Sequence, residues 1–176
     1  MPKQRYLCCL QLNTNLTDIA AIAQEKDAEN LAFRNFLKSR PSDEIDQLVQ
    51  TLDQEITPRV DCTACGNCCN SLMVQVLPYE LTRLATHLDQ PENEVKARYI
   101  ETGSNDSMML MNQIPCHFLK NKCCTIYEQR FEDCRVFPGL HLPQFTNRLF
   151  SMFAHYDRCP IIFNVMEEMK GRLGFV

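Results

Sequence analysis

Residues 62–69 read CTACGNCC, which places four cysteines within eight positions at a C-x2-C-x2-C-C spacing. Thiolates are soft ligands that suit zinc, copper(I) and the iron of iron–sulfur clusters. Two-residue gaps let one tight turn aim successive sulfurs at a common point, and Gly66 permits the positive φ that such a turn often requires. We therefore interpret Cys62, Cys65, Cys68 and Cys69 as one half of a metal site.

A second group of cysteines in the C-terminal half of the chain can supply the other half of that site. Its members are Cys116, Cys123, Cys124, Cys134 and Cys159. Four thiolates close a structural zinc site. Alternatively, three cysteines at a C-x2-C-x2-C spacing with a distant fourth before proline hold bacterial ferredoxin-type clusters, and Cys159 precedes Pro160 in this way. The spacing leaves zinc and iron–sulfur iron both open.

Cys68 and Cys69 are adjacent, and adjacent side chains point apart in an extended chain. Two such thiolates reach a single zinc ion only through an unusual turn. One of them would more readily bind a first centre while its neighbour binds a second centre or another iron of a cluster. The pair therefore predicts more than one metal ion, the alternative being that Cys69 is a buried thiol.

Several other polar residues carry weaker signals. Cys8 and Cys9 are interpreted as small buried side chains, because nothing at ligand spacing surrounds them. His117 is interpreted as a solvated loop residue, with a role beside the metal as the alternative. Arg135 either screens the negative charge that four thiolates leave on a divalent ion or is a surface residue.

Composition limits the partners and the compartment. The 176-residue chain has a net charge of −4 and a pI of about 5.6, which does not favour a nucleic-acid surface. No apolar run near the N-terminus is long enough for a signal peptide or a membrane span. With an odd total of 11 cysteines, we expect a reducing cytoplasm, where thiols bind metals and do not form disulfides.

Apolar periodicity and turn residues predict a mainly α protein with short β-strands (α+β), in which helices pack an irregular, metal-stapled cysteine core. Residues 1–57 are expected to form an N-terminal helical hairpin extension, and residues 58–176 the metal-binding domain. The hairpin consists of a helix from Thr17 to Lys38, capped by Thr17, and a second helix from Ser42 to Ile56.

The remaining elements follow from proline, capping and alternation signals. We expect strands at residues 72–77 and 108–111 that can pair with each other. Pro78 and Pro91 should each open a helix, the second of which ends near Gly103. A further helix should start after Cys124, where Thr125 and Glu128 form a capping-box pattern. Residues 145–156 are expected to form a strand pair or a core segment, and a last helix should follow Pro160.

These motifs together resemble the YkgJ family of cysteine-cluster proteins, also called the zinc- or iron-chelating CxxCxxCC domain. Besides the signature at 62–69, the segment 77–85 is similar to the strand-to-helix segment of that family. The resemblance extends to C-x-F-L at 116–119, C-x-I-Y-x-x-R at 124–130 and C-R-x-F-P at 134–138. It covers roughly residues 58–162.

The resemblance implies eight metal ligands and leaves Cys123 outside the pattern. These ligands are Cys62, Cys65, Cys68, Cys69, Cys116, Cys124, Cys134 and Cys159. Phe131 stands where the family usually has proline, so the resemblance does not predict the conformation of the turn before Cys134.

The function expected from these observations is a metal-binding protein that holds an iron–sulfur cluster or zinc through a composite multi-cysteine site. One alternative is an iron–sulfur-dependent redox or protein-modifying enzyme, since a flagellin lysine N-methylase carries a similar cluster. The other is an adaptor whose metal shapes a surface for a protein partner. The five scattered glycines exclude a dinucleotide or phosphate loop. We expect metal ions as partners, and neither nucleic acid nor membrane.

Overall fold

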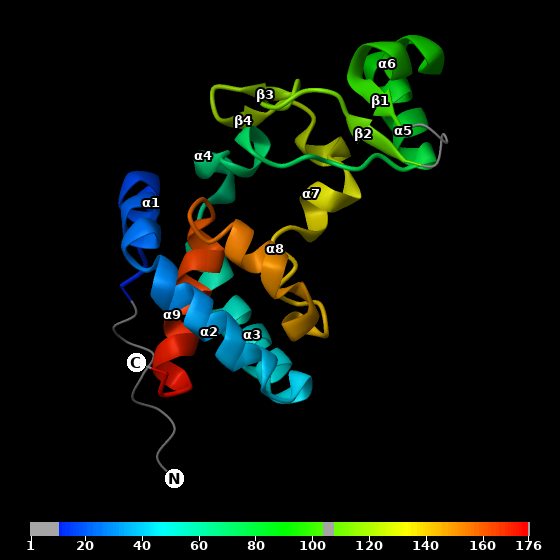
Figure 1. The fold of residues 1–176 in the computed structure, drawn as a ribbon. Coiled ribbons are helices and arrows are strands. Elements are labelled where there is room, and N and C mark those ends of the chain that lie inside the picture. The colour runs from blue at the N-terminus through cyan, green and yellow to red at the C-terminus, as the bar shows by residue number, and fades with distance from the viewer. Residues whose placement is uncertain (1–10, 104–107, 176) are drawn as a thin grey trace. The chain divides into compact units, whose positions relative to one another are not determined.

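The structure is a computed structural model that describes residues 11–103 and 108–175 (Figure 1). Helices dominate, and the strands form two small antiparallel sheets of two strands each, which confirms the predicted mainly α class with short β-strands. The chain falls into two compact units. The helical unit combines the residues up to Val60 with those from Pro138 onward, and the cysteine unit spans Asp61–Phe137.

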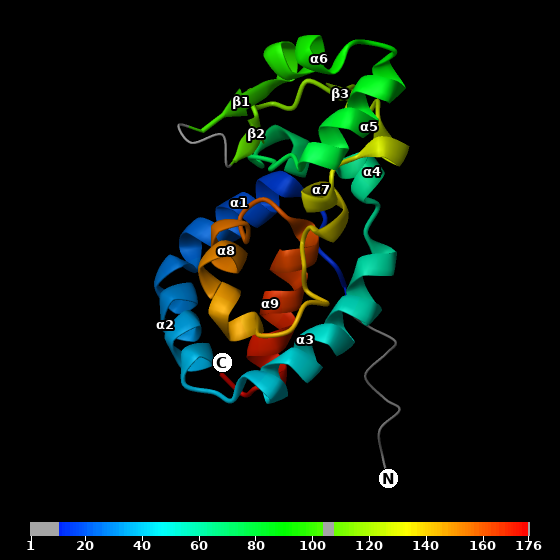
Figure 2. The ribbon, with the colours of Figure 1, turned by 90° about the vertical axis from the view of Figure 1, so that its right-hand side faces the viewer.

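The helical unit is built around its last helix, which the sequence predicted after Pro160. Helix α9 is buried on nearly all sides, and α1 and α3 contact it directly. Figure 2 shows α9 in the middle of the unit among α2, α3 and α8. The elements are α1 (Leu16–Glu25), α2 (Asp27–Lys38), α3 (Ser42–Ile56), η1 (Thr57–Arg59), η4 (Phe145–Arg148), α8 (Leu149–Ala154) and α9 (Pro160–Arg172).

Two predictions for this unit are wrong in detail. The single helix expected from Thr17 is two helices, α1 and α2, and Asn15 caps the first by accepting a hydrogen bond from the Thr17 amide at 2.9 Å. The helix breaks at Lys26, whose ammonium group pairs with Glu167 of α9 across a long sequence separation. Residues 145–156 form η4 and α8 and not a strand pair, whereas the alternative of a core segment is confirmed, because Phe145, Leu149 and Met152 are buried.

Helix α3 begins and ends where the sequence predicted. Its apolar positions recur at helical spacing, so they lie on one face, and that face packs against α9. Ile45, Val49, Leu52 and Ile56 are buried, whereas Leu48 at the edge of the face is half-buried.

The cysteine unit has a small core of its own, to which α5, α6 and both sheets contribute. Sheet β1–β2 pairs Ile100 with Met111, and sheet β3–β4 pairs Leu119 with Cys124. The elements are α4 (Cys62–Cys65), η2 (Cys68–Asn70), α5 (Pro78–Leu88), α6 (Glu92–Tyr99), β1 (Ile100–Thr102), β2 (Met109–Met111), β3 (Leu119–Lys120), β4 (Cys123–Cys124), η3 (Tyr127–Gln129) and α7 (Glu132–Val136).

The local signals of this unit were interpreted correctly for α5, for the start of α6, for β2 and for the positive φ of Gly66, whereas three other expectations need correction. The expected strand 72–77 is reduced to a single bridge, between Gln75 and Leu110, but its expected pairing with β2 is confirmed by this bridge and by two main-chain hydrogen bonds of 2.9 Å. Strand β1 follows directly after α6, so this helix ends at Tyr99 and not near Gly103 as expected. The helix expected after Cys124 is only the turn η3, since the Thr125 hydroxyl donates to the Phe118 carbonyl instead of capping a helix.

The two compact units differ from the two domains that the sequence predicted. The boundary at Val60 lies close to the expected one at residue 57, but residues 138–176 group with the N-terminal helices because α9 packs against α3. Whether residues 58–176 act as one metal-binding domain stays a prediction. No helix in the described part of the chain has the length and apolar character needed to cross a bilayer.

Helix α3 offers a direct test of the helical unit. We expect Leu52→Ala to lower the free energy of unfolding by about 2–5 kcal/mol, because it leaves a cavity under a fully buried side chain. The matched control Leu48→Ala, at a half-buried position of the same helix, should cost clearly less. Chemical denaturation followed by circular dichroism measures both, and equal losses would contradict the packing described.

Candidate metal centre

Cys62 and Cys65 lie on the single helical turn α4, which its own neighbours hold in shape. The carboxylate of Asp61 caps the turn by accepting from the amides of Thr63 at 2.9 Å and Ala64 at 3.2 Å. The Thr63 hydroxyl also donates to this carboxylate, and these bonds, that of the hydroxyl foremost, lower the pKa of Asp61. Gly66 ends the turn in the left-handed region at φ 60°.

Gly66 lies directly against the main chain of the hairpin β3–β4. A Cβ atom at Gly66 would come within 2.3 Å of the Lys122 carbonyl oxygen, so only glycine fits there. Asn121 and Lys122 form the two-residue loop of the hairpin, and both have positive φ, as a type I′ turn requires. This contact brings α4 beside β4, which carries Cys124 (Figure 1). The sequence analysis missed the hairpin, for which Asn121 was the available signal.

Cys68 and Cys69 lie in the 3-10 turn η2, and this turn changes the expected geometry of the pair. The thiol of Cys69 donates a hydrogen bond to Cys68, which lowers the pKa of Cys68 to about 7 and raises that of Cys69. The two side chains therefore do not point apart as in an extended chain. The Cys69 carbonyl also accepts a hydrogen bond from the Cys116 amide at 2.8 Å, which ties the two cysteine groups together.

The thiols of both halves of the pattern affect one another. Burial first, and then the charges of Cys116, Cys68 and Cys124, raises the pKa of Cys134 to about 12. Burial, followed by Cys124 and Cys68, likewise raises the pKa of Cys116. The pKa of Cys62 is raised by burial and then by Cys68 and Cys65. Cys68 is thus a common neighbour of thiols from both groups.

The buried carboxylate of Glu80 fixes the helix that carries Cys134. One of its oxygens accepts from the Leu77 amide at 3.0 Å, at the start of α5. The other accepts from the Glu132 amide at 2.7 Å, at the start of α7, and from Arg83 at 3.3 Å. A single anion therefore holds the N-termini of two helices together. The sequence analysis missed this role, for which the signal was a glutamate three residues after Leu77 at a helix start.

The contacts described for Arg135 and His117 are with groups other than the thiols. Arg135 donates to the carbonyls of Arg130, at 3.1 Å, and Glu128. The imidazole Nε2 of His117 lies 2.7 Å from the Asn112 side-chain oxygen, and its ring contacts Tyr99 edge-on. The contacts described for Arg135 are therefore those of a residue that supports the main chain around η3.

The structure brings seven of the eight predicted ligands into the cysteine unit. Cys159 belongs to the helical unit, where it is buried at the start of α9, and its place relative to the other seven is not determined. Cys123, the extra cysteine, is exposed, and its thiol lies 3.9 Å from the Thr63 carbonyl oxygen. Cys8 and Cys9 lie outside the described residues.

The donor set suits a metal, although the thiols do not form a finished coordination shell. Within residues 11–103 and 108–175, no three Cys, His, Asp or Glu side chains converge closely enough to hold an ion. The seven predicted ligands in this unit are nevertheless soft donors on elements that contact one another, which is the chemistry that zinc and iron–sulfur iron require. Binding would need these side chains to turn toward a common point.

Comparison with known proteins supports the same chemistry. The family model described as "CxxCxxCC: Putative zinc- or iron-chelating domain" matches residues 61–156, more than half of the chain. The matched segment includes all seven cysteines that the cysteine unit contributes and ends before Cys159. No curated protein and no solved structure matches the chain.

The contact at Gly66 leads to a paired prediction. Gly66→Ala should lower the free energy of unfolding by at least about 1–2 kcal/mol, because alanine disfavours positive φ and its Cβ would displace the Lys122 carbonyl. Gly171→Ala, in α9 with open space around it, should instead raise stability by up to about 1 kcal/mol. Denaturant titration of both variants checks the difference in sign.

The role of Glu80 can be tested in the same way. We expect Glu80→Gln to cost about 1–3 kcal/mol, since an amide group would replace an acceptor oxygen of a fully buried carboxylate. Hydrogen exchange at the Glu132 amide should become faster in this variant. Glu92→Gln, an exposed change on the neighbouring helix, should leave both quantities nearly unchanged. Unaltered exchange at Glu132 would rule out the described link.

Proposed function

The chain belongs to the CxxCxxCC family of zinc- or iron-chelating domains, and we propose that it holds its metal in one composite thiolate centre. The protein binds metal through cysteines from both halves of its pattern, with zinc or an iron–sulfur cluster as the group bound. The proposed ligands are Cys62, Cys65, Cys68, Cys69, Cys116, Cys124, Cys134 and, from the helical unit, Cys159.

The observation that carries this proposal is the set of main-chain links between the cysteine-bearing elements. The Cys69 carbonyl binds the Cys116 amide, and Gly66 meets the hairpin that carries Cys124. Glu80 holds the helix of Cys134 against α5. These links place thiols that are distant in sequence in one small unit, where they share Cys68 as a neighbour.

The number of thiols favours more than one metal ion, or a cluster, over a single zinc ion. One structural zinc takes four thiolates, and even these leave a net charge of −2. Seven cysteines in a single unit exceed that need. The contacts described for Arg135 and Arg130 are to main-chain carbonyls and the Tyr127 ring, so none of these contacts pairs either guanidinium with a thiolate.

The metal would cross-link the cysteine unit, which has short strands and a small core. Structural zinc contributes on the order of 10–16 kcal/mol in zinc-finger peptides, which is comparable to the whole stability of an ordinary domain. An iron–sulfur cluster in the same place would also accept and donate single electrons. Under this proposal, metal loading and folding of residues 61–137 are one process.

Anaerobic purification with elemental analysis and a visible spectrum tests the proposal directly. Brown protein with iron and labile sulfide would identify a cluster, and colourless protein with zinc a closed site. We expect Cys62→Ser combined with Cys65→Ser to lose bound metal, because two soft donors become hydroxyls. Cys123→Ser, an exposed cysteine outside the ligand set, is the matched control and should keep the native metal content. Full metal content in the double variant would refute the proposed centre.

Chelation gives an independent prediction for the native chain. We expect a strong chelator to remove metal and, with it, the hydrogen-exchange protection of amides in residues 61–137. Helix α3 should keep its protection, because its apolar face is buried against α9 and not against the cysteines. Exchange measured by mass spectrometry distinguishes this outcome from a uniform effect.

The variant Cys159→Ser should reduce the metal content if the eighth thiol is a ligand.

A further inference from the structure

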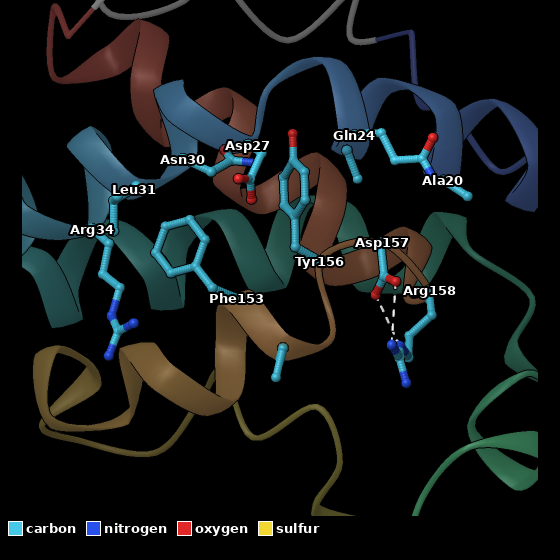
Figure 3. Close-up of a pocket in the computed structure, with 12 residues that line it drawn as sticks. Ala20, Gln24, Asp27, Asn30, Leu31, Arg34, Phe153, Tyr156, Asp157 and Arg158 are labelled. Carbon is cyan, nitrogen blue, oxygen red and sulfur yellow. Dashed lines mark hydrogen bonds and ion pairs between the residues drawn. The ribbon is translucent and has the colours of Figure 1, made fainter.

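A cavity of about 650 Å³ lies within the helical unit, and none of its lining residues belongs to the cysteine unit. One wall is the face of α2 from Asp27 to Arg34, continued by the end of α1. The opposite wall is the end of α8 with residues 154–158 (Figure 3). This volume is in the range of small-molecule sites, roughly 300–1,000 Å³.

The floor of the cavity is polar, buried and held from behind. Tyr156 and Asn30 line the cavity, with 2% and 7% of their surfaces exposed. The Tyr156 hydroxyl donates to Glu167 at 2.6 Å, and the buried Lys170 donates to the Asn30 side-chain oxygen at 2.7 Å. Lys170 and Glu167 pair with each other at 2.6 Å. This network fixes the two floor side chains before any ligand arrives, as a preformed site requires.

Two opposite charges stand at the two ends of the α2 wall. Asp27 and Arg34 are seven residues apart, so they lie on one helix face with about 10 Å of rise between them. Neither forms an ion pair with another residue of the described chain. The Nε of Arg34 is buried without a hydrogen-bond partner there, and its guanidinium lies over the Phe150 ring at 5.6 Å.

The remaining charges of the cavity are paired, and the wall between its ends is apolar. Arg158 donates to Asp157 at 2.8 Å, as the dashed lines of Figure 3 show. In the same view the ring of Phe153 lies between Arg34 and Tyr156. Leu31 lines the α2 wall and is 60% exposed, so a ligand would cover it. A purely anionic ligand would face the carboxylate of Asp27, whereas a zwitterion satisfies both ends.

We propose that this cavity binds a short zwitterionic peptide of about three residues. Its terminal ammonium group pairs with Asp27 and its terminal carboxylate with Arg34, a span that three extended residues cover at about 3.3–3.6 Å each. A central apolar side chain packs against Leu31 and Phe153. The metal centre takes no part in this binding, so the two proposals stand or fall separately.

Isothermal titration calorimetry on the full metal-loaded chain tests the proposal with the tripeptide alanyl-leucyl-alanine. We expect saturable binding of the free peptide. The N-acetylated and the C-amidated forms should each bind about tenfold more weakly, since each loses one charge-assisted contact, and tenfold corresponds to about 1.4 kcal/mol. This comparison uses only the native protein and does not depend on the folding of a variant.

Two variants then assign each end of the peptide. Arg34→Gln should weaken binding of the free peptide about tenfold and remove the difference between the acid and the amide, while the effect of acetylation remains. Asp27→Asn should also weaken binding of the free peptide about tenfold. It should remove the difference between the free and the acetylated peptide, while the effect of amidation remains. Arg40→Gln is the matched control, because Arg40 stacks on Phe36 at 4.4 Å and does not line the cavity.

Three results would overturn the proposal. They are an absence of saturable binding, equal affinity of the native protein for free and capped peptides, and variants that leave both differences in place. Circular dichroism melting curves of each variant verify that the comparison is made on folded protein.

Discussion

Gly66 meets the Lys122 carbonyl with no room for a side chain, and the rest of the cysteine unit depends on this contact. It sets the first cysteine turn against the hairpin that carries Cys123 and Cys124. The hairpin reaches this position because Asn121 and Lys122 accept positive φ, a geometry that costs non-glycine residues roughly 1–2 kcal/mol each. The contact between α4 and the hairpin must therefore stabilise the unit by more than this conformational free energy.

The thiols that this contact brings together are the second feature on which the unit depends. Burial and the neighbouring thiols raise the pKa of Cys116 and Cys134, so these two thiols resist ionisation, whereas the pKa of Cys68 is lowered by its hydrogen bond with Cys69. A metal ion that displaces their protons turns mutual repulsion into shared attraction to one centre. The same closeness that disfavours the charged, metal-free unit therefore favours the metal-bound one. Under the proposed centre, metal binding would add to the small apolar core of this unit.

The sequence was a good guide wherever the deciding signal is local. The period of α3, the prolines that open α5 and α9, and the cysteine spacing each act within a few residues. Three of the misses involve a hydrogen-bond or ion-pair partner that lies outside the motif itself. Lys26 interrupts a helix beside its pairing with Glu167, and Thr125 turns from a cap to the Phe118 carbonyl. The bond from the Glu132 amide to Glu80 joins residues 52 positions apart, which the spacing at the start of α5 does not indicate.

The order of the two units along the chain has a consequence for synthesis. The polypeptide leaves the helical unit at Val60, passes through the cysteine unit and returns at Pro138. A ribosome therefore delivers every cysteine of the inserted unit before it makes α9, the partner of the α3 face. Domains generally fold as they emerge, N-terminal parts first. Cys159, the eighth proposed ligand, follows only at the start of α9, so the complete proposed centre can close only after nearly the whole chain has been made.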